Sequence, residues 1–489
     1  MKKIFLFIAA ATIAGSVMAG GLVTNTNHSA YMVRMLSRHA STGVDAVYFN
    51  PAGLTKLENG FHFSLNNQVI GQTKTITNDY YFLTENPTEY TGTVSAPIFP
   101  GVYAVYKMNK FAFSVGFNPI GGGGGAEYAT GLPSFEMMIS NLVPGLQQQL
   151  APLDQGSIDA IGVDPGFRNV GAYGADIFFE GSSIYFGYQA NISYEINDMI
   201  SVAVGGRYVS AKNTYQGYIT GTTITAAPNA VPGGLTPPYV GAPGDYLRDI
   251  ALTPYGAASA GLLNATAAQL DAMTEVEADV VEQGSGFTPI ISVNISPSDM
   301  FNIALRYEFK TNLDLETTVY DGKDAGGMFV DGATKVADMP AMMSAGVGVH
   351  PTKKLFLAAG MGYYFDKNND YDGSDDIEVE MIDKNFFEYS FGVEYALSDM
   401  FRISAGYSGS QTGVNEDYQS DLRYSLNTTT FGGGFGITIN PMIDINIGGM
   451  YTMYQDGGKT IGQTAPLPAT NETYDTSTWV IGFGVDFHF

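Results

Sequence analysis

The chain has 489 residues, 60 glycines, no cysteine and a net charge of −25. Its charged residues make up only 15%, while aromatic residues reach 13%; soluble domains are typically about 25% charged. The acidic balance argues against a nucleic-acid partner, which needs a basic surface. The missing cysteines exclude disulfides, thiolate metal sites and a lipid-anchor cysteine. Low charge with abundant Tyr, Phe and Gly favours a membrane β-protein.

Residues 1–19 have the form of a secretory signal peptide. Lys2 and Lys3 precede an apolar run over 4–14, and "VMA" at 17–19 is a suitable cleavage site. The run is too short to cross a bilayer as a helix, and no later segment offers the roughly 20 apolar residues required. We therefore expect an exported protein that enters a membrane only as a closed barrel.

Residues 20–60 show mixed polarity and none of the alternation typical of a strand. Their Val, Met, Leu, Tyr and Phe content is too high for a disordered tail. We expect this segment to fold as a plug, or hatch, inside a barrel formed by residues 61–489.

Strict alternation of apolar and polar residues marks the strands of that barrel. "SSIYFGYQANISYEI" (182–196), "MFNIALRYEFKTNLDLE" (300–316) and the terminal "TWVIGFGVDFHF" (478–489) each have one apolar face. Runs of ten or more residues suit a tilted crossing of a bilayer, whereas strands of a soluble sandwich average about 5–6 residues. The soluble sandwich is the less favoured alternative.

The connections between these strands alternate between short and long. Six contain turn formers and are short, and seven are long, so the sequence predicts about fourteen antiparallel strands with both ends in the periplasm. The short connections lie near 107–111, 196–200, 296–301, 350–355, 397–401 and 439–443. The long ones lie near 77–95, 119–182, 220–284, 321–338, 366–385, 411–427 and 455–476.

The two longest loops, 119–182 and 220–284, carry apolar residues at helical spacing over 132–150 and 255–283. These helices either pack on the barrel rim or form an apolar surface that captures a lipid-like ligand. In the second case the ligand contacts include Leu142, Val143, Leu262 and Leu263.

One motif in the predicted plug resembles a segment of a known protein family. "STGVDAVYFNPAGLTKL" (41–57), with its Asn50-Pro51-Ala52 tripeptide, resembles the N-terminal hatch of the FadL family, the outer-membrane transporters of long-chain fatty acids and other hydrophobic compounds. "LRYEFKTNLDLE" (305–316) and "MPAMMSAGVGV" (339–349) resemble two further family segments. The terminal Phe489 resembles the aromatic residue that outer-membrane barrels present to their assembly machinery.

The resemblance implies capture of a hydrophobic ligand by extracellular loops, passage into the barrel and lateral release through a kink in strand three, gated by the hatch. The counterpart of the kink is "FNPIGGGGG" (117–125), with Pro119, Gly121, Gly122 and Gly123. Consecutive glycines and a proline do not sustain a regular strand. The alternative is a flexible start to the loop.

Parity along the strands assigns the charged residues to the two faces. Lys212 faces outward and is expected to reach the membrane rim. Arg306 and Lys310 either contact a ligand carboxylate or join an ion-pair network that braces the barrel, so an uncharged ligand stays possible. The residues expected in the lumen are Arg207, Arg306, Lys310, Arg402, Glu195, Glu308, Glu394 and Asp444.

No sequence feature requires a metal, a cofactor or catalysis. Residues 368–379 approximate a calcium loop but place Val379 where a bidentate Glu is needed, so the acidic loop 366–380 is expected to be solvated or bridged to lipopolysaccharide by divalent ions. The chain has no GxSxG, HExxH or phosphate-binding loop. A general diffusion porin is the alternative function, and an outer-membrane lipase or protease is less favoured.

Overall fold

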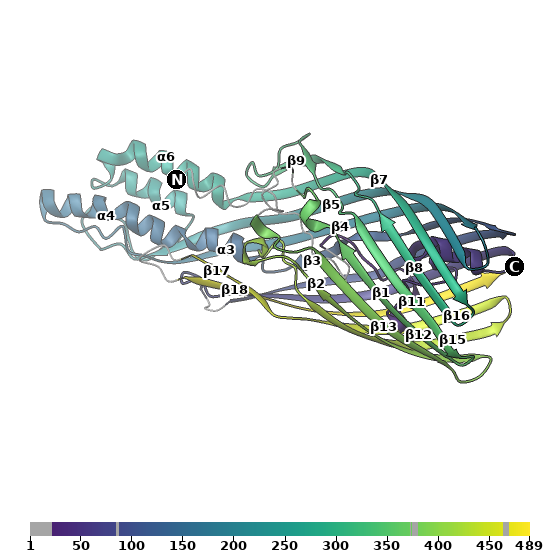
Figure 1. Ribbon diagram of the computed structural model, residues 1–489. Helices are drawn as coiled ribbons and strands as arrows, with labels where there is room; N and C mark the ends of the chain where they lie inside the picture. The colour runs from purple at the N-terminus through teal and green to yellow at the C-terminus, as the bar shows by residue number, and fades with distance from the viewer. Residues whose placement is uncertain (1–21, 85–87, 372, 374–379, 463–468) are drawn as a thin grey trace.

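The computed structural model describes residues 22–84, 88–371, 373, 380–462 and 469–489, so the signal peptide predicted at 1–19 lies outside it. Within the described residues, fourteen long strands form a closed antiparallel barrel (Figure 1). They are β1 (Gly60–Asn78), β2 (Thr88–Met108), β3 (Phe111–Tyr128), β4 (Val170–Glu195), β5 (Ile200–Ala226), β7 (Val276–Ser298), β8 (Phe301–Glu308), β11 (Met342–Thr352), β12 (Leu355–Tyr364), β13 (Phe386–Ala396), β14 (Phe401–Gln411), β15 (Thr428–Asn440), β16 (Ile443–Tyr454) and β18 (Thr470–His488).

The barrel closes where β18 pairs with β1, from His62 opposite His488 to Asn78 opposite Glu472. β8 is continued after a break by β9 (Asp314–Asp324), which pairs with β7. Three short strands lie within the long loops and pair with the ends of β5, β9 and β18, respectively: β6 (Tyr239–Gly241), β10 (Thr334–Val336) and β17 (Gly457–Ile461). The predicted barrel is therefore confirmed.

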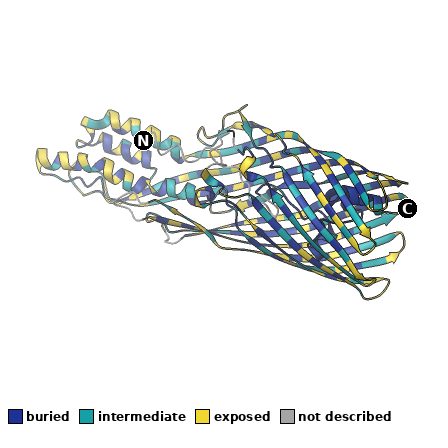
Figure 2. Cartoon of the chain, in the orientation of Figure 1, coloured by how far each residue is buried: buried dark blue, intermediate teal, exposed yellow. Residues whose placement is uncertain are grey.

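The predicted faces of the strands are also observed. Ile192 and Leu305, on the apolar parity, are 50% and 48% exposed. Asn191, next to Ile192 and on the opposite face of β4, is buried. Burial alternates in this way along the wall (Figure 2). An outward apolar band on a closed antiparallel barrel is the architecture of outer-membrane proteins, and this protein is one of them. No helix among the described residues is long and apolar enough to cross a membrane.

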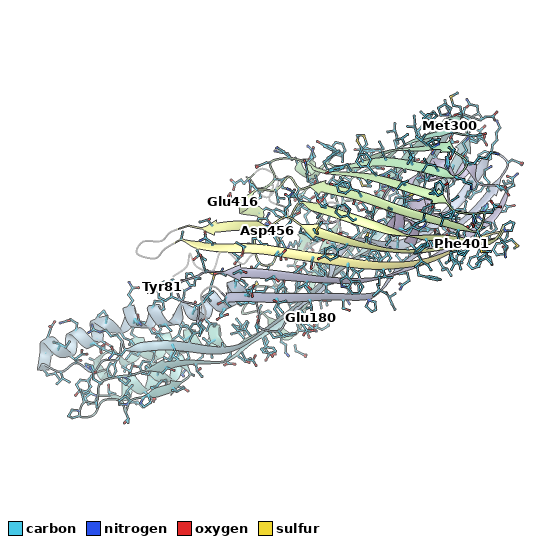
Figure 3. The ribbon with its side chains drawn as sticks, turned by 90° about the horizontal axis from the view of Figure 1, so that it is seen from below. Tyr81, Glu180, Met300, Phe401, Glu416 and Asp456 are labelled. Atoms are coloured by element: carbon cyan, nitrogen blue, oxygen red, sulfur yellow. The ribbon has the colours of Figure 1, made fainter. Side chains whose placement is uncertain are left out.

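All six predicted short connections are tight turns, and they share one end of the barrel. Met300 and Phe401 lie at that end, whereas Tyr81, Glu416 and Asp456 lie toward the other end (Figure 3). Short turns mark the periplasmic end. Phe489 is also there, 62% exposed and with its backbone bonded in both directions to Phe61.

The long loops are shorter than predicted because the strands around them are longer. β3 ends at Tyr128, β4 begins at Val170, β5 ends at Ala226 and β7 begins at Val276, so the loops span 129–169 and 227–275. The prediction of a helix over 255–283 is wrong beyond residue 274, because residues 276–283 belong to β7, alternate between its two faces and pair with β5. The helices of these loops are α3 (Pro133–Ser140), α4 (Leu142–Ile161), α5 (Pro243–Leu252), η3 (Ala257–Ser259) and α6 (Ala260–Thr274).

The segment before β1 folds into α1 (Ala30–Met35), α2 (Ala46–Phe49) and η2 (Pro51–Lys56). α1 contacts β13 to β16 and β18, whereas η2 contacts β2 to β5 and β7. These strands form opposite sides of the wall, so the segment lies inside the lumen, at the periplasmic half (Figure 1).

Two extracellular connections also fold inward. One contains η4 (Asp366–Asn368), and the other contains η6 (Glu416–Tyr418). Tyr371, Ile382 and Tyr418 from these connections join the same buried cluster as Tyr48 and Phe49 of α2. The lumen is therefore filled from both ends, around a shared apolar core.

Candidate functional site

The Asn50-Pro51-Ala52 motif is fixed to the wall by hydrogen bonds. The fully buried Asn50 donates to the Ser41 carbonyl (2.9 Å) and to Asn294 Oδ1 (2.7 Å). The Ala52 amide donates to Ser292 Oγ (3.1 Å), and Ser193 Oγ donates to the Pro51 carbonyl (2.6 Å). Each partner outside the segment is a small polar residue on the inner face of β4 or β7. The motif thus holds η2 against one side of the barrel.

Tyr48, two residues before Asn50, lies beside a cluster of charged side chains in the lumen. The Arg207 and Arg306 guanidinium groups lie 4.9 Å and 4.6 Å from its ring centroid. Arg207 forms a bidentate pair with Glu308 (2.7 and 2.8 Å), and Arg306 is 3.3 Å from the same carboxylate. Arg306 also donates to the Tyr48 carbonyl. Both arginines are therefore occupied by the wall and the hatch.

The other predicted lumen charges are also paired or peripheral. Arg402 pairs with Asp444 (2.7 Å), and Glu394 pairs with Arg34 of α1. Lys310 lies in the break after β8 and pairs with Asp338 (2.6 Å). The last of them, Glu195, is half-buried at the end of β4, whereas Lys212 faces outward as predicted.

The glycine run of β3 interrupts the barrel wall. Pairing between β2 and β3 stops at Val94 opposite Ala126 and resumes at Val102 opposite Phe117. Toward β4, Pro119 faces Phe186 whereas Gly124 faces Ser183, so five steps along β3 span three steps along β4. Two residues of β3 thus lack counterparts, and residues 118–123 are all buried. The segment bulges into the lumen.

The start of the described chain fills this bulge. Thr24 forms a bridge to Gly121, with hydrogen bonds from the Asn25 amide to the Ile120 carbonyl (2.9 Å) and from the Gly122 amide to the Val23 carbonyl (3.1 Å). A Cβ at Gly121 would lie 2.3 Å from that Val23 oxygen, so only glycine permits the approach. Residues 23–25 therefore occupy the inner side of the gap between β2 and β3.

An apolar cavity of about 540 Å³ lies at the opposite, extracellular end. Phe135 and Met138 of α3, Met273 of α6 and Phe329 of the connection 325–333 contribute to its walls. Phe329 stacks on Tyr215 (5.4 Å between ring centroids), and Phe135 meets Phe179 edge-on at 5.5 Å. Its size and aromatic lining are typical of a pocket for a hydrophobic small molecule.

The four apolar residues predicted to contact a ligand do not line this cavity. Val143 and Leu263 are buried together between α4, α5 and α6, and Leu142 packs with Ile139, Ile177 and Ile219. Leu262 is 68% exposed. The helical spacing that suggested these residues reflects packing of the loop helices on one another.

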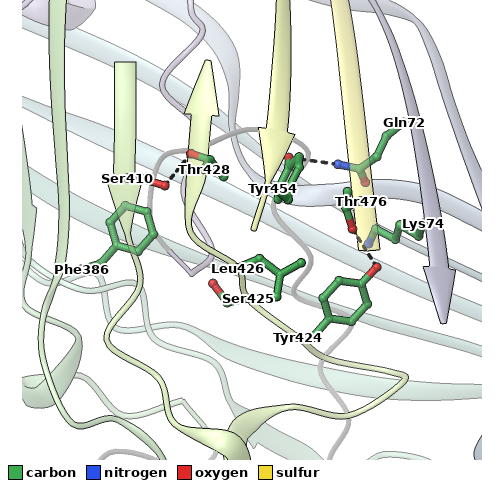
Figure 4. Close-up of a pocket in the computed structure, with 10 residues that line it drawn as sticks. All are labelled: Gln72, Lys74, Phe386, Ser410, Tyr424, Ser425, Leu426, Thr428, Tyr454 and Thr476. Atoms are coloured by element: carbon green, nitrogen blue, oxygen red, sulfur yellow. Dashed lines mark hydrogen bonds between the residues drawn. The ribbon is translucent and has the colours of Figure 1, made fainter. Parts of the chain in front are cut away.

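Two much smaller cavities lie beneath the outer one. A middle cavity of about 10 Å³ shares Phe179 and Leu422 with the outer cavity, and shares Lys74 and Tyr424 with an inner cavity of about 20 Å³. Figure 4 shows the inner cavity, where the Tyr424 hydroxyl bonds to Thr476 (3.0 Å) beside Lys74. Residues 421–426, on the inward-folded connection before β15, separate the three spaces.

Asp421 is the acidic residue of the middle cavity. Its carboxylate accepts the Ser134 amide at the start of α3 (2.7 Å), which ties the inward-folded connection to that helix. Burial raises the pKa of the Asp421 carboxyl above its usual range. Among the described residues, no group of three or more His, Asp or Glu side chains is arranged to hold a metal.

Comparison with solved structures finds the same architecture. A FadL homologue from Pseudomonas aeruginosa aligns with a TM-score of 0.57 at 12% identity, over 96% of this chain and 99% of that one. The fold is that of the FadL barrels. The Ralstonia pickettii toluene transporter TbuX aligns with a TM-score of 0.50 at 17% identity, over 91% and 94% of the two chains.

The Pseudomonas putida toluene transporter TodX aligns with a TM-score of 0.51 at 14% identity, over 91% of this chain and 95% of that one. No protein-family model and no curated sequence matches the chain.

Some residues of this FadL-type barrel were missed by sequence reasoning. Lys74 follows the same inward parity as Gln72 and could have been found by extending the lumen assignment to β1. Phe329 lies in a loop without periodicity, so no sequence signal placed it opposite Tyr215.

Proposed function

We propose that the protein carries hydrophobic small molecules across the outer membrane. The observation that supports this most strongly is the outer apolar cavity, whose aromatic walls face the extracellular end of a filled barrel. Burial of apolar ligand surface there is favourable by about 25 cal/mol per Å². The toluene transporters with the same fold are consistent with this class of ligand.

We further propose that the ligand leaves sideways. The gap in pairing between β2 and β3 would be the exit toward the membrane, and residues 23–25 lie on its inner side, bonded to the backbone of β3. A movement of the hatch that withdraws these residues would connect the lumen to the lipid. Lateral exit suits an apolar molecule, since it avoids the aqueous periplasm.

A general diffusion porin is less well supported. A porin needs a water-filled lumen, whereas here α1, α2 and η2 lie against the wall on several sides and the extracellular connections meet them. The exposed Phe489 ring at the end of β18 remains our proposed signal for the barrel-assembly machinery.

The outer cavity is tested by placing a charge in it. Phe329→Asp should weaken binding of toluene to the purified protein by about tenfold or more, because the carboxylate must be desolvated beside the ligand. The matched control is Leu262→Asp, on the exposed face of α6, which should bind as the unmodified protein does. Titration of the protein in lipid nanodiscs measures both.

Equal loss of toluene affinity in the two variants would indicate that the ligand binds on the outer faces of the loop helices. Absence of binding by the unmodified protein, to toluene and to longer alkanes alike, would reject the proposed function.

A further inference from the structure

Glu136 of α3 is bonded to the strands on both sides of β3. The Tyr90 hydroxyl of β2 donates to Glu136 Oε2 (2.6 Å), and the Tyr173 hydroxyl of β4 donates to Glu136 Oε1 (2.8 Å). A hydrogen bond from a hydroxyl to a carboxylate is shorter and roughly twice as strong as one between neutral groups. We call Glu136, Tyr90 and Tyr173 the α3 clamp. Because β3 lies between β2 and β4, the clamp fixes α3 over the extracellular end of the strand that leads into it.

The clamp lies at one wall of the outer cavity. Phe135 and Met138, on either side of the clamp carboxylate in the chain, both line that cavity. Residues 134–138 are all partly exposed, whereas Phe179 and Tyr215, on the barrel side of the cavity, are buried. α3 therefore separates the cavity from the outside of the protein as a single layer, where the loop helices join the barrel (Figure 1).

Other hydrogen bonds hold the two ends of α3. The Ser134 amide donates to Asp421 Oδ2 (2.7 Å) at its start, and the Tyr80 hydroxyl donates to Asn141 Oδ1 (2.5 Å) just after its end. None of these four residues lines the outer cavity. Loss of the clamp would therefore let the middle of the helix move while its ends stay attached.

We propose that Glu136 is the positioning residue that holds α3 closed over the outer cavity, and that a hydrophobic small molecule enters and leaves the cavity when the α3 clamp opens. This inference rests on the proposed uptake function and adds the step that controls access to its binding site. A helix that covers the cavity both with and without ligand slows entry and exit by the same factor. The clamp therefore sets the rates of binding, whereas the aromatic lining sets the affinity.

The test measures both rate constants by fluorine NMR exchange of para-fluorotoluene with the full protein in nanodiscs. The double variant Tyr90→Phe/Tyr173→Phe keeps both rings and removes both hydroxyls. We expect it to raise the association and dissociation rate constants together, each by about tenfold or more, because hydrogen bonds to a charged group are lost. The dissociation constant should not change. Glu136→Ala should match the double variant, whereas Glu136→Gln, whose amide oxygen still accepts one hydroxyl, should lie between it and the unmodified protein.

Two further variants make the test specific. Tyr246→Phe removes another buried tyrosine hydrogen bond, to the Phe167 carbonyl (2.8 Å), which does not involve α3, and its rates should equal those of the unmodified protein. Asp331→Ala removes the carboxylate that accepts the Val319 amide (2.9 Å) and helps to hold the connection 325–333, another partly exposed wall of the cavity. Unchanged rates in the double tyrosine variant would overturn the proposal. Faster binding in Asp331→Ala alone would in addition place the entrance at that connection.

The affinity distinguishes control of access from support of the cavity. Faster dissociation with an unchanged association rate, and hence weaker binding, would also overturn the proposal, because it would mean that the tyrosine hydroxyls only maintain the shape of the cavity. Failure of the proposed function gives a different result, in which the unmodified protein does not bind para-fluorotoluene at all.

Discussion

Asn50 links the hatch to the wall through one buried amide. Its side chain donates to Ser41 within the hatch and to Asn294 on β7, and its Oδ1 accepts from Ser292 (3.2 Å). A shorter side chain would leave these groups buried without partners, which costs about 1–3 kcal/mol for each unsatisfied group. The local sequence resemblance drew attention to this residue, but its partners on β7 depend on the barrel register.

We therefore expect Asn50→Ala to loosen the hatch. In planar bilayers the unmodified protein should conduct weakly, because its lumen is filled, and the variant should show frequent open steps. Asn197→Ala, in the exposed turn between β4 and β5, should conduct as weakly as the unmodified protein. Steady channels in the unmodified protein would instead favour the porin alternative.

The sequence indicated where the charged side chains lie, but not which of them are available to a ligand. Parity correctly placed Arg207, Arg306 and Arg402 inside the barrel, but partners on other strands decide whether a charge is available to a ligand. Glu308 is shared by two arginines and Asp338 occupies Lys310, contacts that connect segments distant in the chain.

At the scale of elements, the strands were predictable and the loop helices only partly so. Period-two alternation is strong over long strands, and turn formers marked all six periplasmic turns. The extent of β3 to β7 was underestimated because glycine and threonine weaken the pattern above the membrane. The helix over 243–252 was missed, and its buried face packs on α4, α6 and the extracellular ends of β4 and β5.

The outward face of β8 provides an element-scale prediction. Leu305→Arg places a charge in the hydrocarbon and should reduce assembled barrel by a large factor, since arginine near the bilayer midplane costs about 2–4 kcal/mol. Leu305→Phe should assemble normally. The heat-modifiable mobility of the folded barrel on gels measures both, and equal assembly of the two variants would contradict the assigned lipid face.

Arginine on the inward face is not a suitable control. In a water-filled lumen an arginine at Asn191 or Asn446 would be solvated. Both amides instead bond to the hatch, Asn191 to the Val47 carbonyl (3.2 Å) and Asn446 to Arg34 Nε (3.0 Å). An arginine at either position would displace the hatch, so we expect it to disturb the lumen rather than to be tolerated.

At the scale of the whole molecule, the outer cavity, the filled lumen and the gap in the wall form one proposed route. Their arrangement could be expected from the resemblance of the hatch motif, but the cavity itself arises where α3, α6 and the connection 325–333 meet. Such a space depends on long-range packing that no local pattern records. The bulge in β3 was indicated by its glycines, and the register shift shows its size.

Straightening β3 is the most direct test of release through the wall. Deletion of Gly122 and Gly123 removes as many residues as β3 has in excess of β4 between Pro119 and Gly124 and, because the side-chain period is two, keeps every later residue on its face. Toluene binding at the outer cavity should be unchanged, while uptake of radiolabelled toluene by cells should fall by about tenfold or more relative to the unmodified protein. Uptake that continues undiminished through a correctly assembled, straightened barrel would contradict the account.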